Sequence, residues 1–199
     1  MKFKRSRSTL GGQGPEGLPS NRLRGAYVTD AGMHCLWRPS AFASVRDYAS
    51  WDRELGEDDD ILRHIATADL VPITIGADGA FEIEVRVAAT DSPALLSGRE
   101  RTYLDAESEA YRFRSDGELC LSGIELVSAD PDTNVGRLAL AAGEYSVVVQ
   151  LIGWDREPGM RTLDGRPSPD ALPDFVVTVN PSGGRREFRT DLRTFSASP

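Results

Sequence analysis

Residues 70–87 read LVPITIGADGAFEIEVRV, and this stretch decides the fold class. In its second half, apolar residues alternate with charged ones from Phe81 to Val87. A period of two is typical of a β-strand with one buried face and one solvent-exposed face. Asp78-Gly79 separates this run from the alternation before it, and this dipeptide is common in tight turns between strands. The stretch therefore predicts a β-hairpin.

Short apolar alternations separated by turn residues run through the rest of the chain. They lie at 26–28, 35–37, 111–113, 119–121, 138–140, 145–152 and 175–179. Asp116-Gly117 and Gly143 occupy turn positions between neighbouring segments, which predicts two further hairpins. A set of about seven to nine short strands is typical of a sandwich. We therefore expect a mainly β fold, an antiparallel β-sandwich over residues 25–181.

A helical periodicity interrupts this pattern near the N-terminus. Apolar residues recur every three or four positions over 41–55, and Gly56 ends the run. A second amphipathic segment covers 58–68, and acidic residues stand at its start, where the helix dipole favours negative charge. We expect a short two-helix insert at about 41–68.

Charge is distributed unevenly along the chain. The whole chain carries −8, residues 1–24 carry +5 and residues 182–199 carry +2, which leaves −15 for residues 25–181. Both ends contain few apolar residues, and we expect both to be flexible basic tails. The acidic body repels nucleic-acid phosphate and attracts basic proteins.

The sequence contains no legible catalytic, cofactor or metal-binding motif. Lys occurs only at positions 2 and 4, which excludes a phosphate-binding P-loop. His34 and His64 are the only imidazoles, and neither lies in a nucleophile motif or in a metal-ligand spacing. We expect no enzyme activity, no cofactor and no metal.

Two observations concern the cellular compartment of the protein. No apolar run approaches the roughly 20 residues of a membrane helix, and no apolar segment of a signal peptide follows the basic start. Cys35 and Cys120 fit a reducing compartment as two buried thiols, although one disulfide between them stays open. We expect a cytoplasmic protein without a membrane partner.

Residues 107–152 carry a resemblance to a known family. Glu107–Phe113 leads through Ser115-Asp116-Gly117 into a Leu-rich segment, and Arg137–Leu140 leads through Ala142-Gly143-Glu144-Tyr145 into an apolar strand. This succession resembles the ComJ-like family of small β-sandwich inhibitors of the competence-associated DNA-entry nuclease. The resemblance implies a sandwich fold and an inhibitor role, and no functional residue transfers with it.

Our first hypothesis is an acidic, immunity-like protein that binds and neutralises a basic protein such as a nuclease or a toxin. An aromatic anchor beside charged groups is typical of interaction surfaces. The predicted helices contain such a set, and the candidate partner-binding residues are Trp51, Asp52, Glu54, Glu57, Asp58, Asp59 and Asp60. A solvated helix start explains the same carboxylates, so this structural interpretation stays open.

Two alternatives use other features. The loop at 155–173 is long for a compact domain, and loops of this length often cover a ligand or substrate site. The side chains that would line such a cleft are Trp154, Asp155, Glu157, Arg161, Asp164 and Arg166. The second alternative is a structural module of a larger assembly, with the basic tails as tethers.

Overall fold

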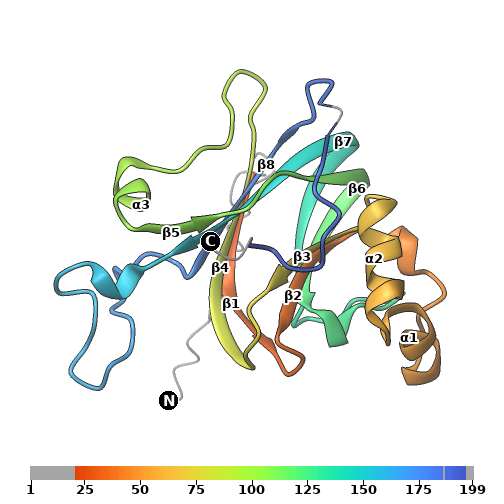
Figure 1. Cartoon of the computed structure of the whole chain (residues 1–199), viewed down its shortest axis with the longest axis horizontal. Helices are drawn as coiled ribbons and strands as arrows, with labels where there is room; N and C mark the ends of the chain where they lie inside the picture. The colour runs from red at the N-terminus through yellow and green to blue at the C-terminus, as the bar shows by residue number, and fades with distance from the viewer. Residues whose placement is uncertain (1–20, 186, 196–199) are drawn as a thin grey trace, which may run out of the picture.

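The structure is a computed structural model, and it describes residues 21–185 and 187–195. Within these residues the chain forms one eight-stranded sheet and three helices (Figure 1). The strands are β1 Arg22–Thr29, β2 Met33–Trp37, β3 Leu70–Thr74, β4 Gly79–Val87, β5 Leu104–Glu107, β6 Tyr111–Gly123, β7 Gly136–Ile152 and β8 Phe175–Pro181. The helices are α1 Tyr48–Leu55, α2 Asp58–Ala66 and α3 Gly98–Thr102, with short 3-10 turns at Pro39–Phe42, Ile124–Leu126 and Trp154–Arg156. The prediction of a mainly β fold is confirmed.

The sheet is continuous and mixed. Its strand order is β1-β4-β8-β7-β6-β2-β3, and β5 pairs with β7 outside this path. All pairs are antiparallel except β4 and β8, where Ile83 pairs with Phe175 in parallel. The connection from β4 to β8 contains β5, β6 and β7, and a long connection of this kind permits a parallel pair. The expectation of an antiparallel sheet is therefore wrong for this pair, and the sandwich is not confirmed.

The three predicted hairpins are also wrong. β3 pairs with β2 and β4 pairs with β1, so the turn at 75–78 joins strands from different parts of the sheet. Asp116-Gly117 lies inside the single long strand β6, at a register shift where Gly117 has φ 138°. Gly143 also lies inside a single strand, β7, where it pairs with Ser115 beside this register shift. A glycine that allows a turn also allows a β-bulge, and β6 and β7 use bulges and continue.

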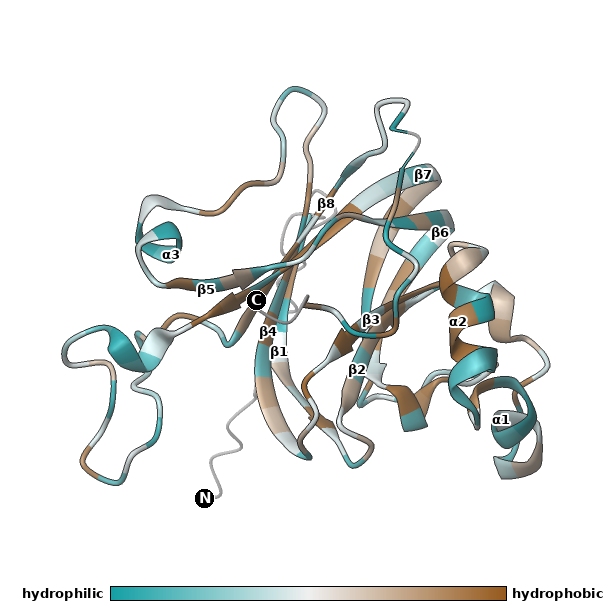
Figure 2. Ribbon diagram, in the orientation of Figure 1, coloured by the Kyte–Doolittle hydropathy of each residue, from teal (hydrophilic) through white to brown (hydrophobic). Residues whose placement is uncertain are grey.

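The core lies inside the curved sheet. The largest fully buried side chains include Trp37, Tyr111, Phe113 and Phe175, which come from β2, β6 and β8. Figure 2 shows hydrophobic segments on the strands of the sheet, with hydrophilic residues interspersed along β6. β1 lies close against the start of β7, as the position of Gly136 shows: an added Cβ there would overlap the Tyr27 hydroxyl. The two strands do not pair.

The helical insert begins later than predicted. Residues 39–42 form a 3-10 turn, and α1 starts only at Tyr48, after Asp47. Asp47 and Ser50 form a capping box, in which the Asp47 carboxylate accepts the Ser50 amide and the Ser50 side chain accepts the Asp47 amide. The cap fixes the helix start, which the apolar periodicity alone does not locate. α2 starts at Asp58 as predicted and ends at Ala66.

Parts of both predicted tails belong to the described fold. Arg22 and Arg24 lie in β1, and residues 1–20 lie outside the described residues. Near the other end, Thr194 is 1% exposed, and its hydroxyl donates to the Pro72 carbonyl at 3.0 Å. Among residues 21–185 and 187–195, no helix has the length and apolar character that a bilayer span requires.

Candidate functional site

An aromatic pair stands at the start of α1. Tyr48 is 77% exposed, and its ring stacks on Trp51 with the centroids 6.2 Å apart and the planes at 22°. The Trp51 indole donates a hydrogen bond to the Ile124 carbonyl at 3.0 Å. Trp51 is therefore held against the Ile124–Leu126 turn, and it supports Tyr48 in a position open to solvent.

A groove runs beside this pair. It has a volume of about 400 Å³, and its walls come from residues before α1 and from the segment after β6: Val45, Arg46, Asp47, Tyr48, Trp51, Glu125, Val127 and Ser128. The walls combine apolar side chains with a few polar groups, which is typical of surfaces that receive another molecule. The sequence prediction included Trp51 but missed Tyr48, because Tyr48 belongs to the apolar stripe that was assigned to the core.

The predicted carboxylates fall into two groups. Asp52, Glu57, Asp58 and Asp59 are exposed, and none of them makes an ion pair with another residue in the described part of the chain. Glu54 and Asp60 are partly buried, and each accepts a hydrogen bond from Arg63 at 3.3 Å. Arg63 therefore neutralises the second group, whereas no ion pair in the described part of the chain neutralises the first.

We name the first group with its aromatic neighbours the α1–α2 surface, defined as Tyr48, Trp51, Asp52, Glu57, Asp58 and Asp59. Tyr48 and Asp52 are one turn apart on α1, so their side chains share a helix face. Asp58 and Asp59 lie in the first turn of α2, where the helix dipole also stabilises them. This set of residues combines an exposed ring with carboxylates that make no ion pair in the described part of the chain.

The two histidines have structural environments. His34 is fully buried, its Nε2 lies 3.0 Å from the Tyr27 carbonyl, and burial lowers its pKa. His64 packs against Phe42 with the ring centroids 4.5 Å apart, and burial, assisted by Arg63, lowers its pKa too. Both imidazoles are therefore held in the neutral form.

The two cysteines are free buried thiols, so the disulfide is not formed. Burial raises the pKa of Cys120 to about 12 and the pKa of Cys35 well above its usual range. A thiol must ionise before it attacks or ligates, so neither is suited to nucleophilic chemistry. In the described part of the chain, no group of three or more His, Cys, Asp or Glu side chains is placed to hold a metal ion.

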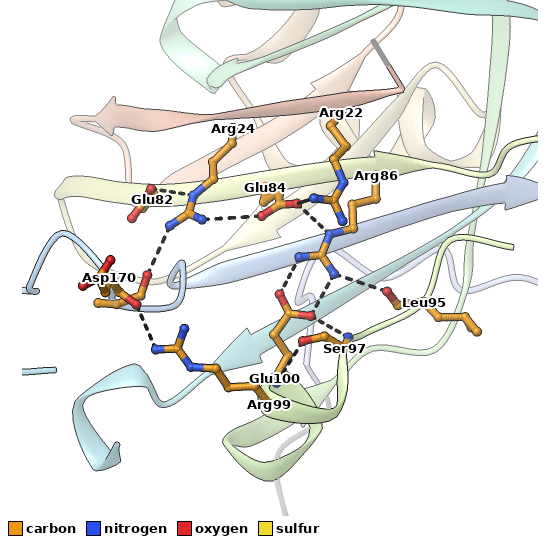
Figure 3. Close-up of polar contacts among 11 residues, drawn as sticks. Arg22, Arg24, Glu82, Glu84, Arg86, Leu95, Ser97, Arg99, Glu100 and Asp170 are labelled. Carbon is orange, nitrogen blue, oxygen red and sulfur yellow. Dashed lines mark hydrogen bonds and ion pairs between the residues drawn. The ribbon is translucent and has the colours of Figure 1, made fainter. Parts of the chain in front are cut away.

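A second polar cluster lies beneath the end of the 155–173 loop (Figure 3). A hollow of about 420 Å³ opens there, and the charged residues that line it are Arg22, Arg24, Glu84, Arg86, Arg99, Glu100 and Asp170. Arg86 donates to Glu84 at 2.7 Å and to Glu100 at 2.8 Å, and all three side chains are buried. Burial disfavours the charged form of Glu100, but the hydrogen bonds from Arg86 and Ser97 outweigh it and lower its pKa to about 2.

The buried charges of this arginine–carboxylate cluster pair with one another. The Arg86 guanidinium is paired with the Glu84 and Glu100 carboxylates, and Glu100 stays ionised at neutral pH, so it has no proton to exchange there. The cluster fixes α3 onto the outer face of β4. Its residues come from β1, β4, α3 and the end of the 155–173 loop, and the only local signal for them was the alternation of charged residues along β4.

The six residues proposed for a cleft under this loop do not line the hollow. They bond with one another or with neighbouring elements: Asp155 with Arg161 at 2.6 Å, and Arg166 with Asp164 at 3.3 Å. Glu157 pairs with Arg99, and the Trp154 indole donates to Asp174. The loop therefore stabilises itself and α3.

Comparison with known proteins gives a fold relationship. No protein-family model and no curated protein sequence matches the chain. The solved structure of the crocagin biosynthetic gene J protein is similar, with a TM-score of 0.55 and 14% identity, over 80% of this chain and 96% of that one. ComJ from Bacillus subtilis, an inhibitor of the DNA-degrading activity of NucA, is similar with a TM-score of 0.44 and 8% identity, over 79% of this chain and 94% of that one. The resemblance predicted from residues 107–152 is thus confirmed as a weak similarity, and the chain shares the fold of the crocagin protein.

Proposed function

We propose that this chain is an acidic interaction protein that binds a basic protein, such as a nuclease or a toxin, and neutralises it through the α1–α2 surface. The observation that carries the proposal is the exposed Tyr48 ring, which is stacked on an anchored Trp51 and accompanied by four exposed carboxylates that make no ion pair within residues 21–185 and 187–195. Exposed aromatic residues of this kind are the usual energetic centre of a protein interface.

The charge of the body supports the same proposal. Residues 25–181 carry −15, so a basic protein is attracted before contact and its association is accelerated. Carboxylates at the rim of an interface act mainly on the association rate and its salt dependence, whereas the aromatic centre acts on the lifetime of the complex. The two parts of the α1–α2 surface therefore have separable roles.

The first experiment identifies the partner. The tagged chain is used to capture proteins from the cell that makes it, and recovery is compared between the natural chain and Tyr48→Ala. We expect a basic protein in the first sample and its strong depletion in the second. Equal recovery of the same protein with Tyr48→Ala would place the contact outside the α1–α2 surface.

The second experiment tests the charges on the captured partner. Asp58→Lys with Asp59→Lys should slow association by about tenfold at low salt and flatten its salt dependence. Glu109→Lys with Glu144→Lys changes the net charge equally but lies outside the α1–α2 surface, and it should have a smaller effect. If the two double variants behave alike, the acidic run is only a helix start.

The alternatives predict other captured proteins. The crocagin protein is named for a biosynthetic role, and a biosynthetic role of this chain predicts pathway enzymes among the captured proteins in place of a basic nuclease or toxin. A structural module predicts members of a stable assembly. A ligand site under the 155–173 loop receives little support, because the groups around the hollow neutralise one another.

A further inference from the structure

The two outer strands of the sheet, β1 and β3, differ in whether other residues cover their free sides. The free side of β3 is covered by residues near the C-terminus: the Thr74 amide donates to the Thr194 hydroxyl at 2.7 Å, and that hydroxyl donates to Pro72. Pro72 itself has no N–H to offer. Natural proteins cover or block sheet edges in these ways, because an open edge can pair with another chain.

Among residues 21–185 and 187–195, no strand pairs with β1 on the side away from β4, although β7 begins nearby at Gly136. β1 pairs with β4 alone, and the Val87 amide donates to the Asn21 carbonyl at 2.8 Å, which fixes the phase of the ladder. Hydrogen-bonded pairs alternate along an antiparallel ladder, so Arg24, Ala26 and Val28 direct their N–H and C=O groups away from β4. In residues 21–185 and 187–195, no hydrogen bond reaches the main chain of these three residues from that side.

A groove follows the Ala26–Val28 part of this edge. It has a volume of about 570 Å³, and Ala26 to Val28 form one wall while Thr133 to Gly136 form the other. From Arg24 to Val28 the edge is about 14 Å long at roughly 3.4 Å per residue. A single extended segment of about five residues matches this length.

The charge at the end of the groove indicates what kind of segment fits. Asp30 and Glu125 line that end, and the Glu125 carboxylate is held there by the Thr29 hydroxyl at 3.1 Å and the Asp30 amide at 3.2 Å. A Lys or Arg side chain on the added segment meets these carboxylates. A second copy of this chain is disfavoured, because its body carries the same −15.

We propose that the free edge of β1 receives an extended basic segment of the protein partner as an added strand. Main-chain hydrogen bonds to Arg24, Ala26 and Val28 hold the segment, and Asp30 with Glu125 selects for positive charge. The inference rests on the proposed function in one respect, that the partner is basic. Glu125 lines both this groove and the groove beside Trp51, so one partner can reach both surfaces.

The test uses a synthetic probe on the full chain. A blocked peptide TVKVRVT is titrated into isotopically labelled protein, and amide shifts and hydrogen-exchange protection are followed by NMR. We expect protection of the Arg24, Ala26 and Val28 amides, about tenfold weaker binding for the acidic match TVEVEVT, and loss of protection when alternate peptide nitrogens are methylated.

A substitution in β1 tests the same main-chain hydrogen bonds by changing the protein in place of the peptide. Ala26→Pro removes only an N–H that points away from β4, so it leaves the ladder to β4 intact, and it should weaken the peptide about tenfold. Ala26→Ser keeps the N–H and should bind normally. If Ala26→Pro does not fold, the methylated peptide still decides the question.

Other outcomes overturn the proposal. Absence of protection along β1, equal binding of the acidic peptide, or binding that survives methylation would each exclude an added basic strand. The α1–α2 surface is tested separately, because Asp58→Lys with Asp59→Lys should leave the β1 protection unchanged. Failure of one surface is thereby distinguished from failure of the other.

Discussion

The arginine–carboxylate cluster gives the sharpest prediction of stability, through the substitution Glu100→Gln. The Glu100 side chain is 3% exposed, caps α3 through the Ser97 amide at 2.7 Å, and pairs with the buried Arg86. Glutamine keeps the size of the side chain and removes its charge. Arg86 then remains buried with Glu84 as its one close anionic partner.

The size of the effect follows from the pKa of Glu100. The folded protein lowers this pKa from 4.5 to about 2. Each pKa unit corresponds to about 1.4 kcal/mol, so the charged form contributes about 3 kcal/mol to the free energy of unfolding. Loss of one partner of a buried ion pair costs a comparable amount, about 3–5 kcal/mol.

The pH dependence has a defined sign. Because the pKa is lower in the folded state, the unfolded chain takes up the proton first as the pH falls. The stabilisation is complete well above pH 4.5 and disappears as the pH falls through 4.5 toward 2. The stability difference between Glu100→Gln and the natural chain should therefore shrink over this interval.

Urea denaturation followed by fluorescence at pH 7 and at pH 3 measures both quantities. Glu118→Gln is the control, because Glu118 pairs with Arg137 at 2.9 Å on the surface, where such pairs contribute about 0–1 kcal/mol. A Glu100→Gln effect no larger than that of the control at pH 7, or one that persists undiminished at pH 3, would refute the reasoning.

Two further predictions concern packing. Gly136→Ala should lower the free energy of unfolding by about 1–3 kcal/mol, because the added Cβ would overlap Tyr27. Gly98→Ala is the control, because a Cβ at Gly98 meets open space, and its free energy of unfolding should change by no more than about 0.5 kcal/mol. Thermal melting of the two variants measures the difference. The thiols of Cys35 and Cys120 should react with a disulfide reagent only after denaturant is added, because burial raises the pKa of both; rapid modification of the native protein would contradict this.

The sequence predicted the local elements better than their partners. Apolar alternation located the main strands, and the acidic run located the start of α2. Strand pairing depends on contacts between distant residues, which alternation does not encode, so the placement of β4 between β1 and β8 was not foreseen. Asp116-Gly117 has the composition of a turn and forms a bulge, because β6 and β7 gain more from a long shared ladder.

The candidate sites show the same limit. The sequence proposed Trp51 and the carboxylates of α2 as candidates, because an aromatic residue beside clustered charge is a local pattern, and their role stays a prediction. The exposed Tyr48 was missed, because the apolar periodicity of a helix does not indicate which of its apolar residues stay exposed. The solvent-exposed face predicted for β4 is in part buried, with Glu84 4% and Arg86 8% exposed, because α3, the next element in the chain, folds back over it.

The position of β8 has a consequence for how the molecule assembles. β8 lies between β4 and β7 and joins a two-stranded ribbon of β1 and β4 to the rest of the sheet. A two-stranded ribbon has little stability alone, and pairing between residues so distant in the chain closes slowly. A nascent chain on the ribosome therefore holds β1 and β4 without their neighbour until Phe175–Pro181 has emerged. The groove beside β1 becomes available only after that, so we expect the β1 groove to form after translation of β8 is complete.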